Sequence, residues 1–319
     1  MQRLVSVIIP CYNAAAYLTK TLHSVESQTY CRIEVILIND GSTDSTIEIC
    51  NSYKDRSRFP VKVLDGPNGG VSVARNKGII AAEGEYLSFL DADDSLAKDA
   101  IKVLVETIET TGADTVYGVW SRNIRSVEEK HNIKCKEQDV YAVMSIYMKK
   151  IYPVAFFNFL YKRKVIDKNN IEFSTGLRYG EDNLFFWKYL CYVNKAVFIN
   201  VPLYWYNDNE ESAMHKTSWN NSYALEAIYT AERYMKHIDF KYISVFSSFM
   251  PARTMLSIAK EYSKHGDREI YEKFLEKYPV KKCAKTLLFK DNLKITIAAF
   301  IMTLSPRSFY LLFHDFLKF

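Results

Sequence analysis

An apolar run that stops at a group of carboxylates is the first place where this chain could do chemistry. Residues 86–90 have the aromatic and aliphatic content of a buried strand, and Asp91, Asp93 and Asp94 follow directly. Alternate residues of an extended segment point the same way, so Asp91 and Asp93 can face one ligand. A divalent cation relieves the repulsion between two neighbouring carboxylates. Their hard oxygen atoms favour Mg²⁺ or Mn²⁺ over zinc.

The same residues also fit an ordinary strand-to-helix turn. Asp94 or Ser95 would then cap a helix that begins at Leu96. Capping needs only one acidic or hydroxyl residue, so it leaves Asp91 and Asp93 without a role. We therefore expect a ligand site at this end of the strand, where open α/β sheets bind their ligands.

A second pair of carboxylates, Glu181 and Asp182, stands at the head of an apolar segment with helical character. Negative side chains are favoured in the first turn of a helix because of the helix dipole. That preference alone accounts for these residue types, so the pair by itself indicates no chemistry.

The elements that would position these groups repeat along the first third of the chain. Residues 5–10 and 33–38 are continuous apolar runs, each followed by a loop and a helical segment. Two such units in succession predict a parallel sheet with right-handed crossovers. Asp40 and Ser42 follow the second run, where they are either turn and cap residues or ligand groups at the carboxyl end of a strand.

A glycine-rich loop follows a short strand expected at residues 61–64. The loop, within residues 65–78, contains Gly69 and Gly70 and leads into a helix that carries Arg75 one turn inside. Glycines permit close backbone approach, and a helix amino end beside an arginine suits a diphosphate. The loop is neither a Walker A loop nor a G-x-G-x-x-G fingerprint, so a C-cap-like glycine turn is the alternative.

The chain then becomes less regular. The sequence pattern predicts an edge strand at residues 115–120. It predicts a charged loop at residues 122–138 and a helix at residues 139–149. The aromatic residues between 152 and 161 are expected mainly in the core, with stacking on the apolar face of a ligand as the alternative. From residue 221 to 278 the pattern is helical, and the remainder is basic and aromatic.

Composition and charge narrow the class of protein. With 319 residues and 48% hydrophobic residues the chain is globular rather than disordered. Its six cysteines form no C-x-x-C pair, which favours reduced cytoplasmic thiols over a disulfide framework or a zinc site. No signal peptide is visible, and the longest near-apolar stretch, residues 295–304, is too short to span a bilayer.

The net charge of +5 is unevenly placed. Residues 281–319 hold seven basic and two acidic residues, interspersed with aromatic and aliphatic ones. Basic and aromatic residues in alternation favour reversible binding to an anionic membrane surface, here the inner face of the plasma membrane. The alternative is a helical cap that packs on the preceding part of the chain and exposes a solvated basic face, because residues 295–304 are apolar enough for a core.

Four stretches together resemble the inverting family 2 glycosyltransferases of GT-A fold, a group that includes bacterial polysaccharide and lipopolysaccharide sugar transferases. They are residues 5–13, 39–44, 70–76 and 90–94, which read VSVIIPCYN, NDGSTD, GVSVARN and LDADD. Their order and spacing match that family over the first third of the chain, and the combination is far more specific than any single stretch.

The resemblance implies an α/β fold with a Rossmann-like, mostly parallel sheet flanked by helices, and a helical C-terminal extension. The catalytic domain would span residues 1–220. Its halves would be a nucleotide-sugar-binding part at 1–115 and an acceptor-binding part at 116–220. The basic and aromatic extension would occupy residues 221–319.

The resemblance also implies roles for individual residues. Asp93 would hold Mg²⁺ or Mn²⁺ on the diphosphate, with Asp91 and His215 as further candidate ligands. Asp182 would be the catalytic base, with Glu181 as the alternative. The donor would be bound by Pro10, Tyr12, Asn13, Asp40, Gly41, Ser42, Asn68, Gly69, Gly70, Arg75, Asp91 and Ala92. The chain departs from the family at Asn207, where an arginine that contacts the diphosphate is common.

The implied function is a metal-dependent, inverting hexosyl transfer from a nucleotide-diphosphate-sugar, with UDP as the nucleotide, to a hydroxyl of a saccharide acceptor. A lipid-linked acceptor in surface polysaccharide synthesis is the expected partner, and no nucleic acid is expected. One alternative is a sugar nucleotidyltransferase, although this sequence lacks the glycine-, arginine- and lysine-rich loop expected near the start of such an enzyme. Another is a non-catalytic nucleotide-sugar-binding subunit, which would not need Glu181 and Asp182.

Overall fold

The computed structural model describes residues 2–122, 134–177, 179–207, 222–264, 268–288 and 293–316. The chain forms two compact units. Unit 1 comprises residues 1–176 and 181–217, and unit 2 comprises residues 177–180 and 218–319.

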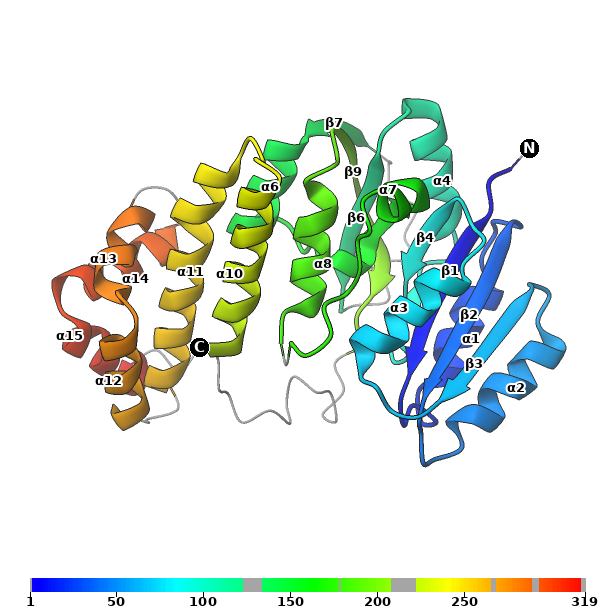
Figure 1. Ribbon diagram of the computed structural model, residues 1–319, viewed down its shortest axis with the longest axis horizontal. Coiled ribbons are helices and arrows are strands. Elements are labelled where there is room, and N and C mark those ends of the chain that lie inside the picture. Colours follow the sequence, from blue (N-terminus) through cyan, green and yellow to red (C-terminus); the bar gives the residue numbers. More distant parts are fainter. Residues whose placement is uncertain are drawn as a thin grey trace. The chain divides into compact units, whose positions relative to one another are not determined.

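Unit 1 is built on one sheet, which has nine strands within the described residues (Figure 1). Neighbouring strands follow the order β3-β2-β1-β4-β8-β6-β9-β5, and β7 pairs with β9. The strands are β1 (Val5–Cys11), β2 (Ile33–Asp40), β3 (Val61–Gly66), β4 (Tyr86–Phe89), β5 (Ser95–Leu96), β6 (Thr115–Ser121), β7 (Cys135–Asp139), β8 (Phe159–Lys162) and β9 (Lys195–Trp205).

The first four strands confirm the predicted parallel arrangement. Strand β1 pairs in parallel with β2 on one side and β4 on the other, so that Val5 lies opposite both Ile33 and Tyr86. Strand β3 extends the parallel part beyond β2. Because all four run the same way, their carboxyl ends meet at one edge of the sheet.

Helices cover both faces of this parallel part because the strands are apolar on both sides. Val7 of β1 belongs to a core shared with α1 (Leu18–Glu26) and α2 (Thr46–Arg56). On the opposite face, α3 (Val71–Ala81) lies close enough that a Cβ added to Gly78 would come within 2.4 Å of the Ile8 side chain. This glycine therefore allows the helix that carries Arg75 to approach the sheet closely.

The expectation of an edge strand at residues 115–120 is wrong. Strand β6 lies inside the sheet, antiparallel to β8 and parallel to β9. Its partners come from residues 159–162 and 195–205, so the pairing that buries it is not visible in the local sequence. The expected charged loop at 122–138 is also revised, because Cys135–Asp139 forms β7 against β9.

The expected helix start at Leu96 is wrong as well. Ser95 and Leu96 form the short strand β5, which pairs with Trp205 and Tyr204 of β9. The next helix, α4 (Ala100–Thr111), begins four residues later. Asp94 caps no helix, because its carboxylate bonds to Tyr204 and to the backbone of Asn207.

The helix expected at 139–149 is present as α6 (Val140–Lys149), and the Asp139 side chain accepts a hydrogen bond from the Ala142 N–H as its cap. The other short elements of unit 1 are η1 (Phe156–Asn158), α7 (Arg163–Lys168) and α8 (Glu181–Leu190). The aromatic residues of η1 and β8 pack in the core, as expected. Phe89 of β4 contacts Phe156, Tyr161, Phe173 and Phe185 with ring centroids 5.3–6.0 Å apart.

Unit 2 is helical within the described residues. Its longer helices are α10 (Ser222–His237) and α11 (Ile243–Lys264), which pack against each other. The later elements are α12 (Arg268–Lys277), α13 (Val280–Ala284), η2 (Lys285–Leu287), α14 (Leu293–Leu304), α15 (Pro306–Leu311) and η3 (Leu312–Phe316). In the described parts of the chain, no helix combines the length and the hydropathy that a membrane crossing requires.

Candidate active site

Asp91 follows β4 at the edge of the sheet where the parallel strands end. Its backbone N–H donates to the Tyr204 hydroxyl over 3.2 Å, and one carboxylate oxygen accepts from Arg75 Nη2 over 2.8 Å. Tyr204 belongs to β9, which residues 91–96 approach through the β5 pairing. The carboxylates of this turn are therefore held between β9 and the helix α3.

Asp94 is the buried member of the group. Its carboxylate accepts from the Tyr204 hydroxyl over 2.6 Å and from the Asn207 N–H over 2.8 Å. Burial, together with the charges of Asp91 and Asp93, raises the pKa of Asp94 to about 8 despite these two hydrogen bonds. Asp94 is therefore the carboxyl group of this turn that most readily holds a proton.

Arg75 joins this turn to a carboxylate from a distant part of the chain. Its guanidinium pairs with Asp91 over 2.8 Å and with Glu181 over 3.2 Å, although its side chain is only 5% exposed. The guanidinium also lies over the rings of Phe156 and Phe173. Burial acts to lower the pKa of Arg75, but the two carboxylates outweigh it and raise the pKa above its ordinary value.

Asn76, the next residue on α3, fixes the chain that leads toward the second carboxylate pair. Its amide donates to the Phe173 carbonyl and accepts from the Phe173 N–H, each over 2.8 Å. Phe173 in turn stacks on Phe185 of α8, with ring centroids 4.0 Å apart. These contacts explain how α8 is held beside α3, so that Glu181 reaches Arg75.

Asp182 is partly buried at the first turn of α8. One carboxylate oxygen accepts from the backbone N–H and the side-chain amide of Asn183, over 2.7 and 2.9 Å, and Asn183 is itself oriented by the Tyr147 hydroxyl. Burial and the charge of Glu181 together raise the pKa of Asp182 to about 6, although Arg75 opposes the rise. A carboxylate with this pKa can accept a proton near neutral pH, which is the property required of a general base.

The glycine-rich loop lies against the carboxyl end of β2. Both oxygens of the buried Asp40 carboxylate accept backbone hydrogen bonds, from Gly69 over 2.9 Å and from Gly70 over 2.8 Å. Gly41 has a φ of +71°, and a Cβ there would stand 2.5 Å from the Asn68 nitrogen. Asp40 and Gly41 therefore hold the loop in place.

The loop after β1 is tied to the same region. The Asn13 N–H donates to Ser42 Oγ over 3.0 Å, and the Asn13 side chain accepts from the Thr43 N–H over 2.8 Å. Pro10 is partly buried at the end of β1, whereas Tyr12 is 55% exposed. An exposed ring beside a fixed loop is available for stacking on a planar ligand.

The structure thus groups the predicted residues into two sets within unit 1. The first, at the ends of β1 and β2, contains Pro10 to Asn13, Asp40 to Ser42 and Asn68 to Gly70. The second contains Arg75, Asp91, Glu181 and Asp182, linked through the guanidinium. Ala92 contributes its carbonyl to Thr21 Oγ1 over 2.8 Å. His215 lies outside the described residues.

Sequence reasoning missed several positioning residues. Tyr204 touches both Asp91 and Asp94, Asn183 and Tyr147 orient Asp182, and Phe173 supports Arg75. The only sequence signal was indirect, since the aromatic content around 152–161 predicted core packing. Polar contacts of aromatic side chains across the sheet have no local signature.

The metal expectation can be tested against the donor set. Among the described residues no three acidic, histidine or cysteine side chains converge as a metal cage. Mg²⁺ and Mn²⁺ do not need such a cage, because Mg²⁺ is commonly held by one or two carboxylates together with phosphate oxygens of the substrate. Asp91 and Asp93 supply hard carboxylate oxygens at the end of β4, and that donor set fits such an arrangement.

This chain belongs to glycosyl transferase family 2, whose model matches residues 6–169. It is similar to the glycosyltransferase GlyG of Streptococcus pneumoniae, with 32% identity over 240 residues that cover 72% of this chain and 78% of GlyG. The enzyme class expected from the sequence is thereby confirmed: the protein is a glycosyltransferase.

Solved structures confirm the GT-A fold. The chain is similar to Staphylococcus aureus TarS 1-349 in complex with UDP-GlcNAc, with a TM-score of 0.68 and 20% identity over 98% of this chain and 90% of that one. It is also similar to the mannosyltransferase PcManGT of Pyrobaculum calidifontis in complex with GDP-Man and Mn²⁺, with a TM-score of 0.55 and 17% identity over 95% and 88% of the two chains.

Proposed function

We propose that this glycosyltransferase moves a sugar from a UDP-sugar to a hydroxyl of a saccharide acceptor, with inversion and with a divalent cation. The single observation that carries the proposal is the bridge of Arg75 between Asp91 and Glu181, which brings the turn after β4 beside the head of α8. Two carboxylates about ninety positions apart in the sequence are thereby linked through one guanidinium, which supports their assignment to the donor side and the acceptor side of one site. The UDP-GlcNAc bound to the structurally similar TarS makes that donor the first to test.

The chemistry assigned to the chain is a single displacement. The acceptor oxygen attacks the anomeric carbon, the bond from that carbon to the diphosphate oxygen breaks, and the acceptor proton passes to the free oxygen of Asp182. Asn183 holds the other oxygen of Asp182 and so orients the carboxylate. Asp93, with Asp91 beside it, would hold Mg²⁺ or Mn²⁺, which when bound supplies positive charge to the leaving diphosphate.

The two loops at the ends of β1 and β2 would bind the nucleotide. Asp40 keeps the Gly69 and Gly70 backbone in position, and Ser42 and Asn13 keep the first loop beside it. Tyr12 is exposed there and would stack on the base. Pro10, Asn68 and Ala92 would complete the donor contacts.

The acceptor is proposed to be a lipid-linked saccharide in surface polysaccharide synthesis, presented at the inner face of the plasma membrane. The support is the excess of seven basic over two acidic residues in 281–319. Electrostatic attraction of this kind gives reversible, salt-sensitive attachment.

A donor panel tests the function. Purified protein is incubated with UDP-, GDP- and TDP-sugars and Mg²⁺ or Mn²⁺, and release of the nucleoside diphosphate is measured. We expect release from a UDP-sugar, with UDP-GlcNAc first, only when a divalent cation is present. Pyrophosphate production from UTP and a sugar 1-phosphate would instead identify a nucleotidyltransferase, and donor binding without any turnover would identify a binding subunit.

The pKa of Asp182 predicts the pH dependence of transfer. The base must be ionised to accept a proton, so kcat/KM should rise with pH and reach half its plateau near pH 6. Below that pH the carboxylate is protonated and the rate should fall about tenfold per pH unit. The measurement is initial rate against pH at low donor concentration. A rate independent of pH between 5 and 7 would contradict the assignment.

Asp93→Ala should weaken donor binding rather than the proton transfer. In the parent, UDP with Mn²⁺ at about a hundred times its Kd should stabilise the fold by about 2.7 kcal/mol, which corresponds to roughly 5 °C in Tm. Without Asp93 the cation-dependent part of that shift should vanish. Asp55→Ala, on the exposed surface of α2, is the matched control and should keep the full shift. An unchanged Mn²⁺-dependent shift in Asp93→Ala would exclude Asp93 as a ligand.

A further inference from the structure

Helix α14 of unit 2 exposes a stripe of large apolar side chains. Leu293, Ile297, Phe300 and Leu304 are 74%, 48%, 53% and 64% exposed. Their spacing of four, three and four residues places them on one side of the helix. We call these four residues the α14 stripe. The opposite side buries Ala298, Ala299 and Met302 in the unit.

The stripe is unusual for this protein. Of the thirteen large apolar side chains that are exposed in the described residues, the α14 stripe and Leu311 account for five. Single exposed apolar residues need no explanation, but a continuous row on one helix marks an interaction surface. Two of the three buried residues of α14 are alanines, so the buried side leaves little space for the larger side chains of the row.

The elements that pack on α14 are basic. Together α13, η2, α14 and α15 hold five lysines and arginines and no aspartate or glutamate, whereas α12 balances three basic residues with three glutamates and η3 contains Asp315. Lys294 is exposed next to the stripe. Burial lowers the pKa of Lys260 on α11, and the charges of Lys264 and Lys294 lower it further, so positive charges repel one another there.

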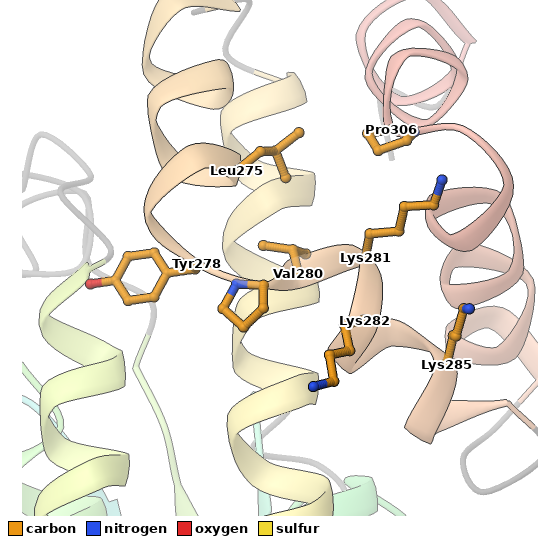
Figure 2. Close-up of a pocket in the computed structure, with 8 residues that line it drawn as sticks. Leu275, Tyr278, Val280, Lys281, Lys282, Lys285 and Pro306 are labelled. Atoms are coloured by element: carbon orange, nitrogen blue, oxygen red, sulfur yellow. The ribbon is translucent and has the colours of Figure 1, made fainter.

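A hollow of about 440 Å³ lies among α12, α13, η2 and α15 (Figure 2). We call it the lysine pocket. Its apolar wall is formed by Leu275, Tyr278, Pro279, Val280 and Pro306. Its basic part is formed by Lys281, Lys282 and Lys285, and none of these forms an ion pair with a described residue. In Figure 2 Lys281 and Lys285 extend on the side of Pro306, and Lys282 extends in the other direction.

Apolar surface next to unpaired lysines matches one ligand chemistry, an anionic amphiphile. We propose that this part of unit 2 docks on an anionic phospholipid bilayer, with the α14 stripe inserted at the interface and the lysine pocket holding a lipid phosphate. Twelve residues make α14 about 18 Å long, so it lies in the plane of the interface and does not cross the hydrocarbon core. The inference rests on the membrane contact within the proposed function and is independent of the transfer chemistry.

A protein partner is the other class of occupant for an apolar helix face. The unopposed positive charge favours the bilayer, because an anionic surface neutralises every lysine at once, whereas apolar protein interfaces are depleted of lysine. A second copy of this chain would place like charges against each other, which is unfavourable.

Vesicle sedimentation tests the proposal on the full-length protein. Vesicles of phosphatidylcholine alone are compared with vesicles of phosphatidylcholine and phosphatidylglycerol in equal amounts. The parent should pellet only with the anionic vesicles and should be released at about 1 M salt, where the Debye length is about 3 Å. Inorganic phosphate at millimolar concentration should not release it, because a free anion lacks the apolar part of the ligand.

Two sets of variants separate the stripe from the pocket. Ile297→Ser with Phe300→Ser should reduce binding to anionic vesicles at least tenfold, whereas Ile80→Ser, an exposed apolar position of α3 in unit 1, should not. Lys281→Glu, Lys282→Glu and Lys285→Glu together should reduce it roughly 100-fold, since each basic residue near the surface contributes about tenfold or less. The matched triple Lys54→Glu, Lys98→Glu and Lys102→Glu changes the net charge equally on exposed positions of unit 1 and should retain binding.

The outcomes are distinct. Equal losses in the two triple variants would mean unspecific charge attraction and would overturn the proposal. Parent protein that stays in the supernatant with anionic vesicles, or a concentration-dependent dimer abolished by the stripe variant, would also overturn it. Hydrolysis of the UDP-sugar in the absence of vesicles should be unchanged in every variant, so loss of membrane binding is distinguishable from failure of the proposed function.

Discussion

Replacing Asp182 with asparagine is expected to lower kcat by roughly 10²–10⁴-fold, the usual contribution of a general base. Asparagine has nearly the same shape, and its carbonyl oxygen can still accept the two hydrogen bonds from Asn183. It cannot take up the acceptor proton. The donor and the cation should therefore bind as in the parent, because the residues proposed for their binding lie on other elements.

The experiment compares transfer rate with donor-induced thermal stabilisation in the same preparation. Asp167→Asn, an exposed carboxylate on α7, is the control and should keep the parental rate. If Asp182→Asn also keeps the parental rate, the base is misassigned and Glu181→Gln becomes the variant to measure. If it loses donor stabilisation, the residue acts in binding rather than in proton transfer.

Arg75→Met should strongly reduce transfer and destabilise unit 1. Methionine fills the space over Phe156 and Phe173 but leaves Asp91 and Glu181 without a cation. Removing one partner from a buried ion pair costs about 3–5 kcal/mol, and the 29% exposure of Asp91 places this case near the lower value. Since Arg75 opposes the rise of the Asp182 pKa, its loss should also move any residual pH profile to higher pH.

Two further variants make this prediction specific. Arg75→Lys keeps the charge but has one ammonium group for two carboxylates, so it should recover stability more than activity. Arg268→Met removes an exposed arginine paired with Glu272 one helical turn away in α12, and it should change neither Tm nor rate. Full activity in Arg75→Met would show that transfer does not require the Arg75 ion pairs. It would remove the main support for a site shared by Asp91 and Glu181.

The parallel part of the fold was predictable because its signals are local. Each of β1 and β2 is a run of β-branched and aliphatic residues that stays apolar on both faces, and a loop and helix follow at once. The position of the carboxylate at the end of each strand follows once the strand has been identified in the sequence. Asp40 and Asp91 were therefore predicted at the same edge of the sheet, where the structure has them.

The second half of the sheet was not predictable in the same way. Strand β6 was expected at an edge of the sheet, but it lies inside because β8 and β9 pair with it from both sides. Likewise, the local sequence predicts a helix start at Ser95 and Leu96, but pairing with β9 holds these residues in an extended strand. Strand pairing between segments far apart in sequence depends on the whole chain, and local propensity does not contain it.

The residues named for the site were visible in the sequence as types and spacings, and their roles there remain proposals. A sequence shows that Asp182 stands at the head of a helix. It does not show that Arg75 connects Glu181 with Asp91, or that burial and the charge of Glu181 bring the Asp182 pKa to about 6. The exposure of the α14 stripe was likewise decided by the tertiary structure. The apolar sequence of 295–304 indicated a possible core segment, but in the fold Ala298, Ala299 and Met302 are buried and the four stripe residues are exposed. The helices and strands whose patterns lie within a few positions of each other were determined by the sequence alone. The pKa values, ion pairs and exposed surfaces depend on which distant side chains become neighbours and exclude water, so they were decided only in the tertiary structure.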